Sequence, residues 1–216
     1  MKVLIIDTTK TNMFVGLMNN NKQQVSQVKG LGRHNETLLT CIDNLLTENN
    51  LLLSDIDAVA VNVGAGSFTG IRIGVSTVKA FACALPNLKC IKFNSLELLA
   101  YSNNVEGEYD AIISAGALNL YVAHCDGRTL LNQFHNTLEE FNESSHKIIV
   151  ASHEEKSILP VSADYYIEEL KYFELVNKKI TNNEYCCATT LEPIYLRLSQ
   201  AERELEAKEN ANNQTN

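Results

Sequence analysis

The stretch 58-AVAVNVGAGSFTGIRIGVSTVKAFACAL-85 decides the fold, because it joins an apolar run, a glycine-rich segment and a long apolar helix pattern. The continuous apolar residues at 58–63 predict a buried strand. Residues 70–85 have helical spacing and carry only Arg72 and Lys79 as charges. A helix without a polar face must be covered on nearly all sides. We expect this cover to come from a duplicated half of the same chain or from a second polypeptide, and the sequence leaves both open.

The glycine-rich segment does not fit the common phosphate or nucleophile motifs. A P-loop needs Lys and Ser or Thr after its last glycine, whereas Gly70 is followed by Ile and Arg, and the dinucleotide motif fails on glycine spacing. A nucleophile elbow, Gly-x-Ser-x-Gly, fails because the two glycine positions around Ser67 are Ala65 and Thr69. We expect Ser67 and Thr69 to cap the helix, and these two residues with Asp7 are the candidate contacts for an anion or nucleotide. Arg72 opposes the helix dipole in the first turn, so we expect a compensating anion from a ligand, a partner or this chain.

The order of apolar runs and helical patterns repeats along the chain. Three strands, a helix, a strand, a helix and a strand are predicted within residues 1–93, and a weaker copy begins at residue 109. The repeat predicts a duplicated α/β fold. The predicted strands are 3–7, 13–18, 24–29, 58–63, 88–93, 109–114, 119–125, 130–135, 147–151, 164–167 and 194–198. The predicted helices are 35–48, 70–85, a short one from residue 137, 168–179 and one from residue 199.

The composition is that of a globular protein with a substantial core and an acidic surface. The 216 residues are 45% hydrophobic, with a formal net charge of −8 and a pI near 5.2. This charge repels a phosphate backbone, so nucleic acid is disfavoured as the dominant direct partner. The N-terminus does not resemble a signal peptide, and no apolar run approaches the roughly 18 residues of a membrane helix. The six cysteines lack CxxC spacing and the histidines lack HxxxH spacing, so we predict buried thiols in a reducing compartment and no metal site.

Four motifs, in this order, resemble those of the bacterial TsaB (YeaZ) family. They are 5-IIDTT-9, 32-GRHNETLL-39, 64-GAGSFTGIRIGVSTVKAFA-82 and 195-YLRLSQAERE-204. The resemblance covers most of residues 1–100 and the segment 193–204. Ala65 stands where the family usually has proline, and Ser114-Ala115-Gly116 stands where it tends to have Asp-Ala-Arg.

The resemblance implies an ASKHA fold, which is actin-like and built from two related ribonuclease H-like subdomains. We expect residues 1–104 to form the first subdomain, with 193–207 packing back on it. We expect residues 105–192 to form a smaller second subdomain and 208–216 a disordered tail. Such folds place metal and phosphate contacts at a carboxylate like Asp7, usually before a glycine-containing turn. Because Thr-Thr-Lys-Thr-Asn follows here, we predict that Asp7 instead caps the turn.

The resemblance also implies a function. TsaB-like proteins are cytoplasmic, non-catalytic partners of the paralogue TsaD, together with the ATPase TsaE. The complex transfers a threonylcarbamoyl group to N6 of adenosine 37 in tRNAs that read ANN codons. TsaD-type chains carry a His-x-x-x-His metal pair, whereas 93-FNSLELLAY-101 contains no histidine. No catalytic or metal-binding residue is therefore expected here. ATP and metal are expected on the partner subunits, tRNA is contacted only indirectly, and no membrane is involved.

In this family the helices at 35–48 and 70–85 form the face that meets TsaD, and the same face forms homodimers when TsaD is absent. We expect the glycines and small residues to let two protein surfaces approach closely. The predicted partner-binding residues are Leu38, Ile42, Leu45, Arg72, Gly74, Ser76 and Ala80.

Two other functions stay open at this point. One is an independent ATP-dependent phosphotransferase of the same fold, which would need Asp7 near a magnesium ion. The other is a metallopeptidase, which the missing histidine pair disfavours.

Overall fold

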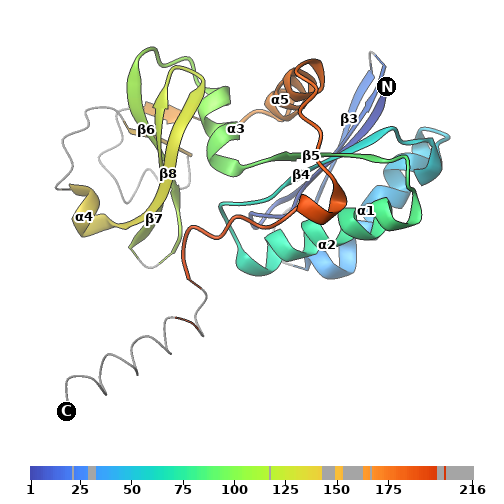
Figure 1. The fold of residues 1–216 in the computed structure, drawn as a ribbon, viewed down its shortest axis with the longest axis horizontal. Helices are drawn as coiled ribbons and strands as arrows, with labels where there is room; N and C mark the ends of the chain where they lie inside the picture. The colour runs from blue at the N-terminus through green and yellow to red at the C-terminus, as the bar shows by residue number, and fades with distance from the viewer. Residues whose placement is uncertain are drawn as a thin grey trace.

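Two five-stranded sheets with the same topology form the framework of the protein (Figure 1). The computed structural model describes residues 1–20, 22–28, 33–116, 118–142, 149–152, 163–165, 167–198 and 202. The first sheet has the order β3-β2-β1-β4-β5, in which β1 is antiparallel to β2 and parallel to β4. Its strands are β1 (Lys2–Asp7), β2 (Met13–Asn19), β3 (Lys22–Val28), β4 (Ala58–Asn62) and β5 (Lys89–Phe93).

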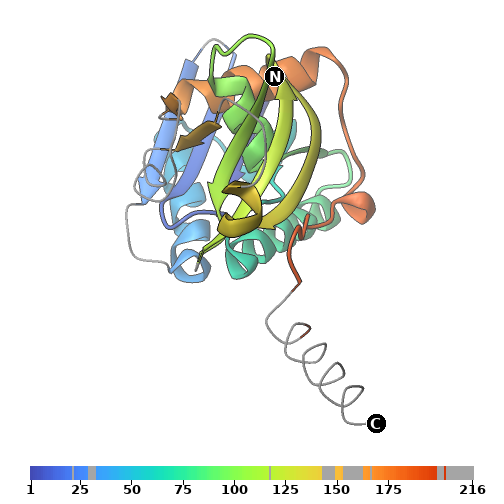
Figure 2. The same ribbon diagram turned by 90° about the vertical axis from the view of Figure 1, so that its left-hand side faces the viewer.

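The second sheet repeats this order as β8-β7-β6-β9-β10, and Figure 2 turns it toward the viewer. Here β6 is antiparallel to β7 and parallel to β9. The duplication that the sequence pattern predicts is therefore confirmed. The strands are β6 (Glu108–Ser114), β7 (Asn119–Asp126), β8 (Thr129–Thr137), β9 (Ile149–Ser152) and β10 (Ala163–Tyr165).

Helices cover both faces of the first sheet, as Figure 1 shows. Helices α1 (His34–Glu48) and α2 (Phe68–Ala84) lie on one face, and α5 (Glu169–Thr181) lies on the other. Successive residues of β1 alternate between these two layers, because side chains of a strand point to opposite faces. Leu4 and Ile6 pack toward α1 and α2, whereas Val3 and Ile5 pack toward α5. Every residue of β4 is buried, which explains the unbroken apolar run at 58–61.

Helix α3 (Ser95–Ser102) connects the two sheets. Leu98 packs in the layer between α5 and the first sheet, whereas Leu96 and Leu99 pack against the second sheet. No helix was predicted at these residues. The signal for α3 was local, since Asn94 and Glu97 form a capping box, a motif readable from sequence. The short α4 (Leu138–Asn142) follows β8.

The chain returns to the first sheet earlier than expected. Helix α5 already packs on that sheet from residue 169, whereas the predicted return begins at residue 193. Residues 194–198 are not a strand, so that prediction is wrong, although Ile194 N donates a hydrogen bond to Val63 O at 2.7 Å. The predicted helix from residue 199 and the predicted disordered tail lie outside the described residues, apart from Glu202. Within the described ranges, no helix combines the length and the apolar character that crossing a membrane requires.

Candidate functional site

The carboxylate of Asp7 is the centre of a buried polar network where β1 and β4 end. Its Oδ1 accepts hydrogen bonds from the backbone N and the Oγ1 of Thr9, at 2.9 and 2.7 Å. Its Oδ2 accepts from Asn62 Nδ2 at 2.9 Å and from the Tyr172 hydroxyl at 2.8 Å. Ser95 Oγ accepts from Asn62 Nδ2 at 2.9 Å and lies 3.2 Å from Thr9 Oγ1. Asp7 is only 1% exposed, so four donors of its own chain replace the water that it loses.

Four elements bring this network together. Asp7 ends β1, Asn62 ends β4, Ser95 opens α3 and Tyr172 lies on α5. The Tyr172 ring stacks on Phe14 of β2 with centroids 4.0 Å apart, which fixes the direction of its hydroxyl. The two bonds from Thr9 confirm that Asp7 caps the turn after β1. The structure therefore uses this carboxylate to join β1, β4 and α5.

Sequence reasoning missed three members of the network. Asn62 had a readable signal, because it is an amide inside the apolar run 58–63, and a polar residue buried there needs a partner. Ser95 follows the N-cap of the missed helix α3. Tyr172 had no local signal, since it is 165 positions from Asp7 in the sequence. Only the fold brings α5 to the end of β1.

The loop glycines let the loop pack against the turn after β1. A Cβ on Gly66 would lie 2.6 Å from Thr9 O, and one on Gly70 would lie 1.9 Å from Thr8 O. Ser67 N donates to Thr9 O at 2.7 Å, and Thr8 Oγ1 donates to Gly70 O at 2.6 Å. The expectation that these glycines serve contact between two proteins is corrected, because the close approach occurs within this chain.

Four of the predicted partner-binding residues lie in the core. Leu38, Ile42 and Leu45 are between 1% and 3% exposed and point from α1 into the core between the two helices and the first sheet. A Cβ on Gly74 would lie 2.7 Å from Thr8 Oγ1, because α2 rests here on the turn that follows β1. These four residues therefore do not face outward, and their choice as a partner surface is wrong for this structure. The physical reason is that the apolar stripe of α1 packs on its own sheet.

The other three predicted residues, Arg72, Ser76 and Ala80, are exposed on α2. Cys83 and Ala84 are also exposed and continue the same side of the helix. We call Ser76, Ala80, Cys83 and Ala84 the outer row of α2. This row is uncharged and consists of small side chains.

The partners of Arg72, the cation in the first turn of α2, are aromatic side chains. The Arg72 guanidinium lies 4.0 Å from the centroid of the Phe68 ring, and its Nε donates to the Tyr195 hydroxyl at 2.9 Å. The Phe68 and Tyr195 rings stack with centroids 4.3 Å apart. Aromatic faces thus take the place in which we expected an anion. Ser67 is the N-cap, as predicted, since its Oγ accepts from Gly70 N at 3.2 Å, and Thr69 is exposed in the first turn.

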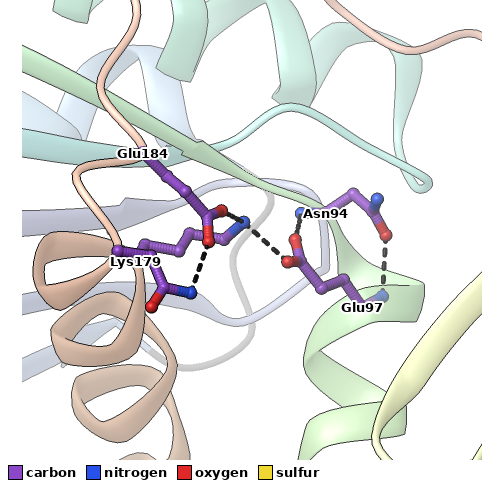
Figure 3. A network of polar contacts seen from close by, with 5 residues as sticks. Asn94, Glu97, Lys179 and Glu184 are labelled. Carbon is purple, nitrogen blue, oxygen red and sulfur yellow. Dashed lines mark hydrogen bonds and ion pairs between the residues drawn. The ribbon is translucent and has the colours of Figure 1, made fainter.

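A partly buried ionic cluster, in which Lys179 is buried and Glu184 is exposed, joins α3 to the end of α5 (Figure 3). Lys179 Nζ lies 2.6 Å from Glu97 Oε1 and 3.1 Å from Glu184 Oε2. Burial alone would lower the pKa of Lys179, but the carboxylates of Glu97 and Glu184 outweigh it and raise that pKa. The hydrogen bond from Asn182, followed by the Lys179 ammonium, lowers the pKa of Glu184. These shifts favour the charged forms of Lys179 and Glu184, and the ion pair between Lys179 and Glu97 ties α5 to α3.

The turn that departs from the family pattern receives a charge from elsewhere in the chain. Arg197 Nη1 donates to Ala115 O at 3.4 Å, within the Ser114-Ala115-Gly116 segment. Arg197 belongs to the motif 195-YLR-197, so the C-terminal return brings a guanidinium to a turn that lacks its own. Among the described residues, no three His, Cys, Asp or Glu side chains gather where they could hold a metal ion.

These features define the class of the protein. Two sheets of identical topology, an acidic residue ending the first strand and a glycine loop leading into a helix are those of an ASKHA, actin-like fold. The family model described as TsaD, tRNA N6-adenosine threonylcarbamoyltransferase, matches residues 19–163. The chain belongs to this family, and within it to the TsaB (YeaZ) group.

Individual relatives agree with this assignment. The chain is 25% identical over 122 residues to the tRNA threonylcarbamoyladenosine biosynthesis protein TsaB of Buchnera aphidicola, covering 55% of each chain. It is 33% identical over 82 residues to that of Escherichia coli, covering 38% of this chain and 36% of the relative. The chain thus spans about half the length, or less, of these curated relatives. YeaZ from Pseudomonas aeruginosa has the same fold, with a TM-score of 0.73 at 20% identity, over 90% of this chain and 99% of that one.

Proposed function

We propose that this chain is a non-catalytic subunit of a cytoplasmic complex that transfers threonylcarbamoyl to N6 of adenosine 37 in tRNAs reading ANN codons. Its partners in this proposal are a TsaD-type paralogue, which carries the transfer chemistry, and a TsaE-type ATPase. ATP and metal belong to those partners, and tRNA is contacted only through them. Membership of the TsaD family and the names of the TsaB relatives support the pathway.

The saturated carboxylate of Asp7 is the observation that carries the non-catalytic part of the proposal. A carboxylate offers about four lone-pair sites, and four donors of this chain use them. To bind a cation or activate a nucleophile, Asp7 would have to give up bonds that compensate its burial. That exchange is unfavourable for a residue that is 1% exposed.

The exposed side of α1 and α2 is the surface that we assign to the TsaD-type partner, and to a second copy of this chain when the partner is absent. The outer row of α2 is uncharged and small, so another helix can approach its backbone closely. On α1, Leu39 is 58% exposed and adds apolar area to the same side of the sheet. Depletion of charge with apolar contacts is typical of the centre of a protein interface.

Reconstitution tests the function directly. The chain is mixed with tRNA, ATP and threonylcarbamoyl-adenylate, with or without TsaD-type and TsaE-type proteins, and the modified nucleoside is measured by mass spectrometry. We expect no product from this chain alone, and product in the complete mixture that drops when this chain is omitted. Modification by the isolated chain would refute the non-catalytic role, and an unchanged yield without it would refute the requirement.

A matched pair of variants tests the surface. Ala80→Arg places a long charged side chain in the outer row of α2, whereas Asn177→Arg makes the same addition at an exposed site of α5 on the opposite face. We expect Ala80→Arg to weaken association with the TsaD-type protein by at least about tenfold, or about 1.4 kcal/mol. Asn177→Arg should bind normally. Calorimetric titration measures both, and equal affinities would show that α2 is not the contact surface.

A further inference from the structure

Three thiols gather at the outer edge of the first sheet. Strand β5 is the last strand of that sheet, and Cys186 pairs with its Cys90 in an isolated antiparallel bridge. Cys186 N donates a hydrogen bond to Cys90 O at 2.9 Å. Cys90 is 1% exposed, Cys186 is half-buried and Cys187 is exposed, and all three thiols are free in this structure. None of them takes part in the Asp7 network or in the outer row of α2.

The backbone already places Cys90 and Cys186 at the separation that a disulfide needs. Directly opposed residues of an antiparallel pair have Cα atoms about 4.5 to 5.5 Å apart. Disulfides join Cα atoms about 4.4 to 6.8 Å apart. Opposed residues also share one face of the sheet, and both side chains pack against the layer beneath α2. Side-chain rotation, with little movement of the main chain, therefore brings the two sulfur atoms together.

We propose that Cys90 and Cys186 form a reversible disulfide that locks the return segment, residues 186–197, onto β5. The oxidant is a small-molecule disulfide such as glutathione disulfide. The Cys186 thiolate attacks one of its sulfurs, forms a mixed disulfide and releases one glutathione thiolate. The Cys90 thiolate then attacks Cys186 Sγ, and the bond to the second glutathione breaks. Two protein thiols lose their protons and two electrons, and glutathione disulfide becomes two glutathione molecules.

Burial decides the order of these steps and makes them selective. Cys90 does not meet a solute directly because it is covered, so half-buried Cys186 is the point of entry. Burial raises the pKa of both thiols, and the Lys92 ammonium partly offsets this for Cys186. Exposed Cys187 also reacts with glutathione disulfide, but it is not the residue opposed to Cys90. It is therefore the natural control.

The lock would act on the segment that holds the start of α2. Residues 186–197 include Ile194, which bonds to Val63, and Tyr195, which stacks on Phe68. A covalent link at Cys186 restrains this segment and also lowers the conformational entropy of the unfolded chain. We expect the oxidised protein to unfold at a higher temperature than the reduced protein.

Peptide mapping tests the proposal on the full chain. The protein is incubated with glutathione disulfide, free thiols are blocked with iodoacetamide, and the digest is examined by mass spectrometry. We expect a Cys90–Cys186 peptide two hydrogens lighter than its parts, which dithiothreitol releases. The peptide should be lost in Cys186→Ser and kept in Cys187→Ser and Cys83→Ser. Oxidation should raise the melting temperature of the wild type and of Cys187→Ser, but not that of Cys186→Ser.

Two results would overturn the inference. One is glutathione on Cys187 with no Cys90–Cys186 peptide, and the other is a link of Cys90 to Cys187 instead. Circular dichroism checks that Cys186→Ser folds. If it does not, Cys90→Ala is used in the same assay, and a stabilisation by oxidation that survives in Cys90→Ala counts against the proposed pair.

Discussion

At the scale of single residues, Asp7 accepts both local and long-range hydrogen bonds, and only the local ones can be predicted from the sequence. The capping bond from Thr9 spans two positions, so the residue types in 7-DTT-9 are enough to predict it. The bond from Tyr172 depends on where a distant helix lands, and no pattern near either residue encodes that meeting. Sequence therefore predicted the role of Asp7 in its turn but not the partners that saturate it.

Removing one donor from Asp7 measures the value of this saturation. Tyr172→Phe keeps the ring stacked on Phe14 but leaves Asp7 Oδ2 with one bond fewer in a buried site. We expect the free energy of unfolding to fall by about 1 to 3 kcal/mol, because the buried carboxylate of Asp7 loses one of the hydrogen bonds that compensate its burial. Urea denaturation measures the change. Tyr185→Phe is the control, since its hydroxyl makes a long 4.0 Å contact to Met1 Sδ, and equal losses in both variants would contradict the argument.

At the scale of elements, periodicity predicts that a helix exists more reliably than which side it turns outward. Helices at 35–48, 70–85 and 168–179 were predicted within two residues at each end. Helix α1 buries its apolar stripe, including Leu38 and Ile42, as amphipathic helices of a monomer do. Helix α2 is small and apolar around most of its circumference, so its sequence does not distinguish the side that rests on β1 from the outer row. The close approach of Gly70 and Gly74 to Thr8, in the turn after β1, decides which side is buried.

A single methyl group tests that approach. In an ordinary helix, replacing glycine by alanine stabilises by about 1 kcal/mol. At Gly70 the added carbon would lie 1.9 Å from Thr8 O, a backbone atom that cannot move aside cheaply. We expect Gly70→Ala to lower the free energy of unfolding by about 1 to 3 kcal/mol. Chemical denaturation decides the sign, with exposed Ser76→Ala on the same helix as control. A gain in stability for Gly70→Ala would show that α2 does not rest on this turn.

At the scale of the whole molecule, the duplication was readable because strand and helix patterns recur in the same order. The exchange of helices between the two sheets was not readable from the sequence. Helix α3 follows the last strand of the first sheet but packs largely on the second, and α5 follows the last strand of the second sheet but packs on the first. Sequence order suggested two successive subdomains, whereas the structure interleaves them. The Lys179 cluster is the ionic contact between these two crossing helices.

The pH dependence of stability reports on that contact. Because the pKa of Lys179 is raised in the folded state, its contribution is complete below the unfolded value of about 10.4 and is lost as pH rises through the folded value. The pKa of Glu184 is lowered, so its contribution holds above about 4.3 and is lost as pH falls. A plateau between these limits is expected.

Lys179→Met removes the cation while keeping the length of the side chain. At pH 8 we expect a loss of about 1 to 3 kcal/mol in the free energy of unfolding, because Glu97 loses a charged hydrogen bond. The difference from the wild type should be smaller at pH 11, because this pH lies above the unfolded pKa of lysine, about 10.4, and the pKa of Lys179 is raised in the folded state. Guanidinium denaturation at the two pH values measures it, and a difference that stays constant would mean that packing, not charge, holds α3 to α5.

The crossing of α3 and α5 has a consequence for any attempt to divide the protein. A fragment ending at residue 104 would keep every strand of the first sheet but lose the helix that shields Ile5 and Phe14. A fragment beginning at residue 105 would lose the helix that shields Tyr109 and Ala111. Each piece would present one bare hydrophobic wall to solvent. Each duplicated half therefore covers a hydrophobic face of the other, and we expect the two halves to unfold as one cooperative unit.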